Sequence, residues 1–154
     1  MVADVLRLGP LLGLVLVLGV LVSACGSSQS TGSTTRDVAQ VEQTLTRAFR
    51  ALASGDGGTV CALATASGRR TLAASVPNTD CASVVTLVSE HLSPGQRAAL
   101  ASVQIHKVTV KGRSASVSDS DITAARGSLK GFIQPHSAPT RLVKESDGSW
   151  KISG

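Results

Sequence analysis

The hydrophobic pattern divides the chain into an apolar leader, a polar link and a longer region of amphipathic segments. Residues 11–22 are all aliphatic except for two glycines. This run of about a dozen residues is shorter than the ~20 that a permanent membrane-spanning helix requires. One Asp and one Arg precede it. A short apolar segment after a weakly charged start is the order of a secretory signal peptide.

The link that follows is polar and uncharged. Residues 26–35 contain only Gly, Ser, Thr and Gln. Such a composition buries too little apolar surface to order itself, so we expect a flexible tether over 25–35. The pattern therefore predicts a signal peptide over 1–24, this tether, and one small domain over 36–154.

The first half of the domain has the helical period. A stripe at three- and four-residue steps predicts a helix, capped by Thr35 or Asp37 and stopped at Ser54-Gly55; its members are Val38, Val41, Leu45, Ala48, Phe49 and Leu52. A turn over 55–58 leads into a short second helix that contains Val60, Cys61, Leu63 and Ala64. Further helices are expected over 81–92 and 94–101, with a looser segment over 67–80.

The period changes to alternation near residue 103. Strands are expected over 103–110, with a bulge at His106-Lys107, and over 114–119, 128–133 and 140–145. An Asp147-Gly148 turn predicts a closing hairpin with Trp150 and Ile152 on one face. Helices followed by antiparallel strands make an α+β domain, with N-terminal helices packed on a curved antiparallel sheet.

The composition limits what can fill the core and what the chain can bind. The chain has no Tyr, one Trp and two Phe, so Val, Leu, Ile and Ala must make the core. We expect Trp150 inside it, against Val41, Leu45 or Phe49; the alternative is a ligand-stacking residue. The formal charge is +5, but the basic residues are scattered and no aromatic residues lie between them, which argues against nucleic-acid binding. A solvated surface, biased toward an anionic membrane or cell wall, is preferred.

The end of the apolar run carries the clearest motif. Leu-Val-Ser-Ala-Cys-Gly, ending at Cys25-Gly26, resembles the lipobox of bacterial lipoprotein precursors. In that family the cysteine receives a diacylglycerol and becomes the first mature residue. The resemblance implies lipidation at Cys25 and attachment to the outer face of the cell membrane. An ordinary secretory signal or an uncleaved anchor are the alternatives.

The other two cysteines form an even pair. An exported domain lies in an oxidising compartment, so Cys61 and Cys81 are expected to form a disulfide. A metal site is the alternative, although neither residue has a His or second Cys at ligand spacing.

The order of elements also carries a resemblance. Amphipathic helices, a Val-rich meander with a Lys-Gly-Arg turn at 111–113 and the terminal LVKESDGSWKIS hairpin look like nuclear transport factor 2-like and ketosteroid isomerase-like proteins, especially small lipid-anchored ones of actinobacteria. The resemblance implies a cone-shaped fold with a pocket. A sheet of another topology is the competitor. The isomerases use an Asp base with a Tyr and a protonated Asp as oxyanion donors, and this chain has no Tyr.

Candidate catalytic groups are few. Asp119 and Asp121 would share the concave face if strand alternation continued, where burial could raise a carboxyl pKa; a polar strand end or turn over 118–121 is the alternative. His91, His106 and His136 stand isolated, and nucleophile-elbow, phosphate-loop and dinucleotide patterns are missing. We therefore expect no cofactor, no metal and no catalytic site.

These observations favour a non-enzymatic, lipid-anchored binding or accessory module of the cell envelope. Its expected partners are the membrane, through Cys25, and a small apolar ligand or an envelope protein. The alternative is a small pocket enzyme of isomerase or hydrolase type that uses Asp119 or Asp121.

Overall fold

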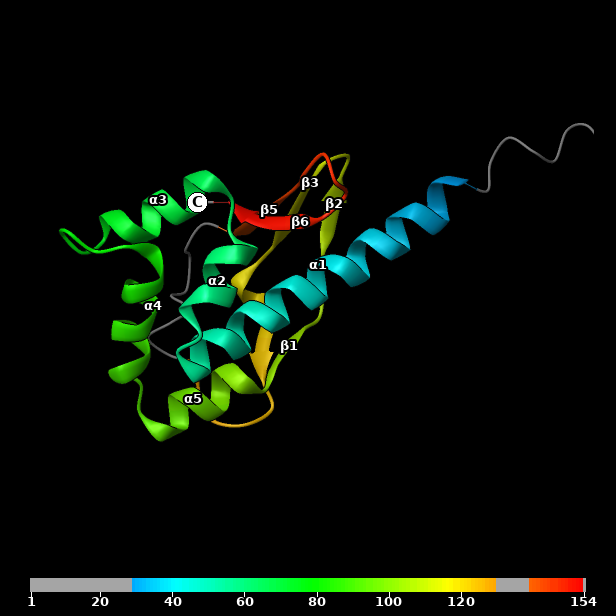
Figure 1. Ribbon diagram of the computed structural model, residues 1–154. Coiled ribbons are helices and arrows are strands. Elements are labelled where there is room, and N and C mark those ends of the chain that lie inside the picture. The colour runs from blue at the N-terminus through cyan, green and yellow to red at the C-terminus, as the bar shows by residue number, and fades with distance from the viewer. Residues whose placement is uncertain (1–28, 130–138, 154) are drawn as a thin grey trace, which may run out of the picture. The chain divides into compact units, whose positions relative to one another are not determined.

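Helices and antiparallel strands together form an α+β structure (Figure 1). The computed structural model describes residues 29–129 and 139–153. Contacts divide the chain into two units, Met1–Ser33 and Thr34–Gly154. The elements in the described ranges are α1 (Gln29–Ser54), α2 (Gly57–Leu63), α3 (Ala66–Ala74), α4 (Cys81–Glu90), α5 (Pro94–Ala101), β1 (Val103–Ile105), β2 (Thr109–Lys111), β3 (Ser114–Val117), a 3₁₀ turn (Asp119–Asp121), β4 (Ile122–Ala124), β5 (Thr140–Lys144) and β6 (Trp150–Ser153).

The first helix is longer than its apolar stripe predicts. The stripe is buried as expected, with Val41 and Leu45 almost fully enclosed. However, α1 begins at Gln29, inside the segment expected to be a tether. Neither expected cap, Thr35 or Asp37, starts the helix, because both lie inside it. The Asp37 carboxylate instead accepts hydrogen bonds from Lys144 and Trp150. Helical backbone therefore replaces coil from Gln29 onward.

The second and fourth helices approach each other closely. A Cβ added to Gly57 would lie 2.3 Å from the carbonyl oxygen of Ala82. Asp56 caps α2 by accepting from the Thr59 N–H, and Asp80 caps α4 by accepting from two backbone N–H groups. These caps fix where each helix begins, so that the two helices meet at a glycine.

The segment over 67–80 is more regular than expected. Residues Ala66–Ala74 form α3, whose N-cap Thr65 accepts a hydrogen bond of 3.0 Å from the N–H of Gly68. The sequence feature that indicates this helix, and that the prediction did not use, is an N-cap Thr followed by residues of adequate helix propensity. Arg69 of α3 donates to the carbonyls of Cys61 and Ala64, which ties α3 to the end of α2.

The strands form two antiparallel sheets. The larger has the order β2-β3-β5-β6, and the smaller pairs β1 with β4. The closing hairpin is confirmed: Gly148 has φ +83°, and the N–H of Glu145 donates to the carbonyl of Ser149. On the far edge of the larger sheet, Ala64 bridges to Ile152 of β6, so the end of α2 lies against the sheet.

Two predicted strands are corrected. The expected strand over 103–110 is two strands in different sheets, because the chain leaves β1 to pair with β4 and re-enters as β2. The expected strand over 128–133 is not formed at Ser128 and Leu129, and its remainder lies outside the described residues. Instead β4 forms at Ile122–Ala124, where no element was predicted.

The core lies between α1 and one face of the larger sheet. Register places Val110, Ala115, Leu142 and Ile152 in one row across the four strands. Ala115 and Leu142 are buried in the same apolar cluster as the α1 stripe, and the other two pack against it. Because side chains alternate along strands, the rows on either side of this one face away from α1.

Candidate functional site

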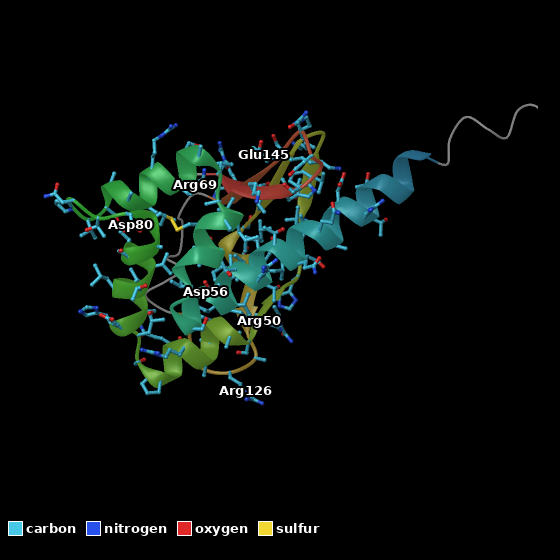
Figure 2. All side chains as sticks on the ribbon, in the orientation of Figure 1. Arg50, Asp56, Arg69, Asp80, Arg126 and Glu145 are labelled. Carbon is cyan, nitrogen blue, oxygen red and sulfur yellow. A yellow bond between two sulfur atoms is a disulfide. The ribbon has the colours of Figure 1, made fainter. Side chains whose placement is uncertain are left out.

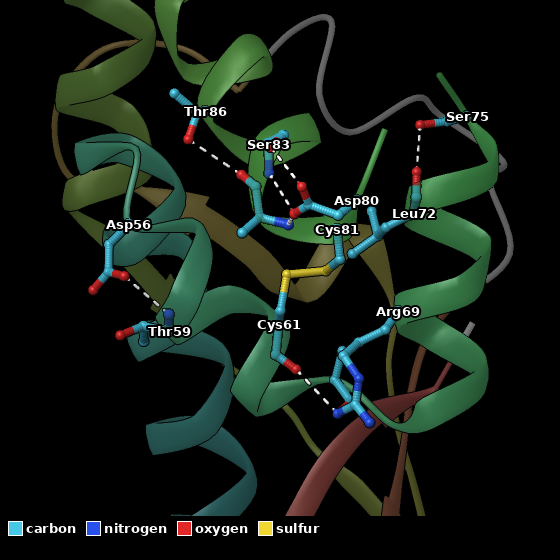
Figure 3. Close-up of a disulfide and its surroundings, with 12 residues drawn as sticks. Asp56, Thr59, Cys61, Arg69, Leu72, Ser75, Asp80, Cys81, Ser83 and Thr86 are labelled. Carbon is cyan, nitrogen blue, oxygen red and sulfur yellow. Dashed lines mark hydrogen bonds between the residues drawn. A yellow bond between two sulfur atoms is a disulfide. The ribbon is translucent and has the colours of Figure 1, made fainter. Parts of the chain in front are cut away.

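The predicted disulfide is present. Cys61 of α2 and Cys81 of α4 are bonded, with 6.2 Å between their Cα atoms (Figure 3). The bridge joins the helices that also meet at Gly57, and the caps at Asp56 and Asp80 begin those helices. Hydrogen bonds hold the pKa of each of these carboxyls below its ordinary value, chiefly that from Thr59 to Asp56 and that from Ser83 to Asp80.

The predicted lipidation residue, Cys25, lies outside the described residues. None of the helices in the described ranges combines the length and apolar content needed to cross a membrane. Lipidation at Cys25 therefore remains a prediction from the sequence.

Asp119 and Asp121 do not continue a strand. The strand ends at Val117, and the two residues belong to a 3₁₀ turn in which the N–H of Asp121 donates to the carbonyl of Ser118. The turn breaks the alternation that would have placed both carboxylates on the concave face. The polar-turn alternative is therefore the one observed, and the two hollows described below are lined by other residues.

The histidines in the described ranges make local contacts. A ring nitrogen of His91 lies 2.8 Å from the carbonyl of Leu87, and one of His106 lies 2.6 Å from the hydroxyl of Thr123. His136 lies outside the described residues. In the described part of the chain, no group of three or more His, Cys, Asp or Glu side chains is placed to hold a metal ion.

Trp150 is buried, with an exposed fraction of 3%, in the cluster that contains Val41 and Leu45. Its indole N–H donates to Asp37 over 3.3 Å, and the Lys144 ammonium lies 2.6 Å from the same carboxylate oxygen. The ammonium also lies 5.8 Å from the indole centroid, within reach of a cation–π attraction. The prediction that Trp150 is a core residue is confirmed.

The Asp37–Lys144 pair was not predicted from the sequence. The partners are 107 residues apart, so no local spacing could have indicated them. The hydrogen bond from Lys144 lowers the pKa of Asp37, partial burial opposes this, and the Trp150 hydrogen bond lowers it further. The pair fastens the start of the domain to the end of β5.

A hollow of about 400 Å³ opens on the outer face of the larger sheet, opposite α1. Its polar lining is made of hydroxyl groups and two cations, namely Thr109, Lys111, Ser114, Ser116, Arg141 and Ser153. Leu142 and Ala115 contribute to the lining although both are buried toward the core. The sequence pattern predicted these strands, but the register between them was needed to bring the polar positions together.

A second, shallower hollow of about 390 Å³ lies on α4 and the start of α5. Its apolar lining includes Leu87 and Val88, which are about 40% exposed, together with Leu92. His91 and Gln96 complete the rim.

Comparison of the sequence and structure with protein-family models, curated proteins and solved structures gave no match.

Proposed function

We propose that this chain is a non-enzymatic, lipid-anchored binding or accessory module of the cell envelope, held at the outer face of the cell membrane by lipid on Cys25. The observation that carries the proposal is the disulfide between Cys61 and Cys81 in a domain that follows a lipobox. Disulfides persist in oxidising, extracytoplasmic compartments. A signal sequence and a disulfide are two independent features that support the same location.

The proposed anchor has a physical basis. One acyl chain gives marginal, reversible membrane binding, whereas a second chain makes attachment stable. A diacylglycerol on Cys25 supplies both chains. Only nine positions separate Cys25 from Thr34, the first residue of the folded unit. Even a fully extended link of that length spans about 30 Å, so the domain would stay near the bilayer.

The cone-shaped fold of nuclear transport factor 2-like proteins is part of the proposal. Its support is the packing of α1 against one face of an antiparallel sheet, through Val41, Leu45 and Trp150. This fold hosts both enzymes and binding domains, so fold alone does not choose between them. The proposed partners are an envelope protein or, as expected from the sequence, a small apolar ligand.

Metabolic labelling with a palmitate analogue tests the anchor. The full chain should label and fractionate with membranes, and Cys25→Ser should abolish both. A chain with Cys61→Ser and Cys81→Ser is the matched control: it also loses cysteines but should still label. If Cys25→Ser labels and remains with membranes, the proposal is wrong.

A further inference from the structure

We propose that the hollow on the outer face of the four-stranded sheet binds an acidic glycan, that is, a hydroxylated chain that carries carboxylate or phosphate groups. The site deepens the proposed function, since it supplies a ligand class for the binding module, in place of the small apolar ligand expected from the sequence. Three features of this face support it: the charge of the outward rows, the freedom of two cations, and the spacing between them.

The outward rows are basic and rich in hydroxyls. Register places Thr109, Ser116, Arg141 and Ser153 in one row, and Lys111, Ser114, Val143 and Lys151 in the other. These rows hold three cations, four hydroxyls and one apolar side chain, with no carboxylate. A ligand that donates and accepts hydrogen bonds and also carries negative charge is complementary to such a face.

Two of these cations are available to a ligand. Lys111 and Arg141 are exposed, and neither head group bonds to or pairs with another described residue. Lys151 differs, because its ammonium donates to the carbonyl of Ala62. Uncommitted cations beside a hollow keep their full charge for an incoming anion.

The spacing favours a ligand with more than one anionic group. Lys111 is on β2 and Arg141 is on β5, with β3 between them. Two strand spacings of about 4.8 Å and a step of two residues, ~7 Å, place their Cα atoms roughly 12 Å apart. A chain lying across the strands would reach both cations without requiring the two long side chains to converge on one point.

The hollow fits this ligand better than a bilayer or a nucleic acid. A bilayer surface is broad and would not reach the floor formed by Leu142 and Ala115. Proteins that hold single-stranded nucleic acid stack its bases on aromatic side chains, and no described residue that lines the hollow is aromatic. The hydroxyl groups around the cations are suited to a sugar chain.

The experiment measures binding of oligogalacturonate, a carboxylated sugar chain, to the full chain purified in neutral detergent. Titration calorimetry at low and at physiological salt should give saturable binding that salt weakens, with no binding of a neutral malto-oligosaccharide of equal length. The variant with Lys111→Gln and Arg141→Gln should bind at least about tenfold more weakly, since it loses two charge-assisted contacts.

The matched control removes the same charge elsewhere. Arg47 and Arg50 are exposed and belong to α1, which packs on the core face of the sheet, opposite the hollow (Figure 2 labels Arg50). The double variant with Arg47→Gln and Arg50→Gln should keep binding within about twofold, because exposed charges on the opposite face are largely screened. A variant that exchanges Lys111 for Arg and Arg141 for Lys should bind nearly as well as the unaltered chain. An unchanged Trp150 emission spectrum confirms that each variant is folded.

Several outcomes overturn the proposal. These are no oligogalacturonate binding by the unaltered chain, equal losses in the two glutamine variants, or binding to vesicles containing phosphatidylglycerol, or to single-stranded DNA, without binding to the oligosaccharide. Cys25→Ser should bind the oligosaccharide unchanged. Failure of the lipid anchor would therefore be seen separately from failure of the site.

Discussion

Truncation of Trp150 to Ala is the sharpest test of how the domain is held together. The side chain is 97% enclosed. A buried Trp removes roughly 150–250 Å² from water, which at about 25 cal/mol per Å² contributes about 4–6 kcal/mol. The alanine methyl and partial collapse of the cavity recover some of this. We therefore expect Trp150→Ala to lower the free energy of unfolding by about 3–5 kcal/mol.

A conservative change separates packing from hydrogen bonding. Trp150→Phe keeps most of the apolar surface but removes the N–H that donates to Asp37. The carboxylate still has Lys144 at 2.6 Å, so it is not left without a partner. The expected loss is about 1–2 kcal/mol, clearly smaller than that of the alanine variant.

Urea unfolding followed by far-ultraviolet circular dichroism measures both losses, because the variants lack the fluorophore. In the unaltered chain the same burial predicts short-wavelength emission that acrylamide quenches poorly. Leu87→Ala is the control: Leu87 is 41% exposed, so it should change stability by less than about 0.5 kcal/mol. A loss below about 1 kcal/mol for Trp150→Ala, or red-shifted and freely quenched emission, would refute the reasoning.

Three further predictions concern the helix pair and the acid side of stability. Replacing Cys61 and Cys81 together by Ser should cost about 3 kcal/mol in chemical denaturation, because the bridge closes a loop of 20 residues; equal stability would contradict this. Gly57→Ala should cost about 1–3 kcal/mol, because its methyl would lie 2.3 Å from a backbone oxygen of α4, whereas Gly58→Ala has room and should be neutral or stabilising. The lowered pKa of Asp37 contributes stability that is present above the carboxyl's ordinary 3.8 and lost as pH falls through the lowered value. Asp37→Asn should therefore destabilise the domain at pH 7. It should also reduce the dependence of the free energy of unfolding on pH below 3.8, measured by chemical denaturation at a series of pH values; an unchanged dependence would count against the ion pair.

The elements that depend on local chemistry could be predicted from the sequence. The helix at Pro94 begins as expected because Ser93 and Gln96 exchange side-chain hydrogen bonds with each other's backbone in a capping box. The hairpin at Asp147-Gly148 forms as expected because glycine adopts the positive φ that the turn requires. Each signal lies within a few residues, so tertiary contacts had little to override.

The elements that depend on distant partners could not be predicted. β4 has only three residues, and it exists because Ile122–Ala124 pairs with β1. The contacts of Asp37 have the same kind of cause, since its partners Lys144 and Trp150 lie over 100 residues away. The hydrophobic periodicity along the chain does not show which residues pair across long separations in the sequence. The same limit explains why the alternation at Asp119 was extended too far.

The positive charge shows the difference between counting residues and placing them. The sequence gives a net charge of +5 with no obvious cluster, which suggested a merely solvated surface. In the described part of the chain, four basic side chains instead donate to backbone carbonyls at the ends of helices or on neighbouring strands; these are Arg69, Arg97, Arg113 and Lys151. A fifth, Lys144, is paired with Asp37.

What is left for a ligand is decided by strand register. Lys111 and Arg141 are 30 positions apart in the sequence and belong to no shared motif, yet pairing through β3 brings both to the rim of one hollow. A shift of one residue in that pairing would turn the outward side chains of a strand toward the core. The buried row of Ala115 and Leu142 opposes such a slip, because the slip would expose these core side chains to water. The packing that stabilises the domain therefore also fixes the arrangement of charge on its outer face, and changes at Ala115 or Leu142 should weaken ligand binding without touching a charged residue.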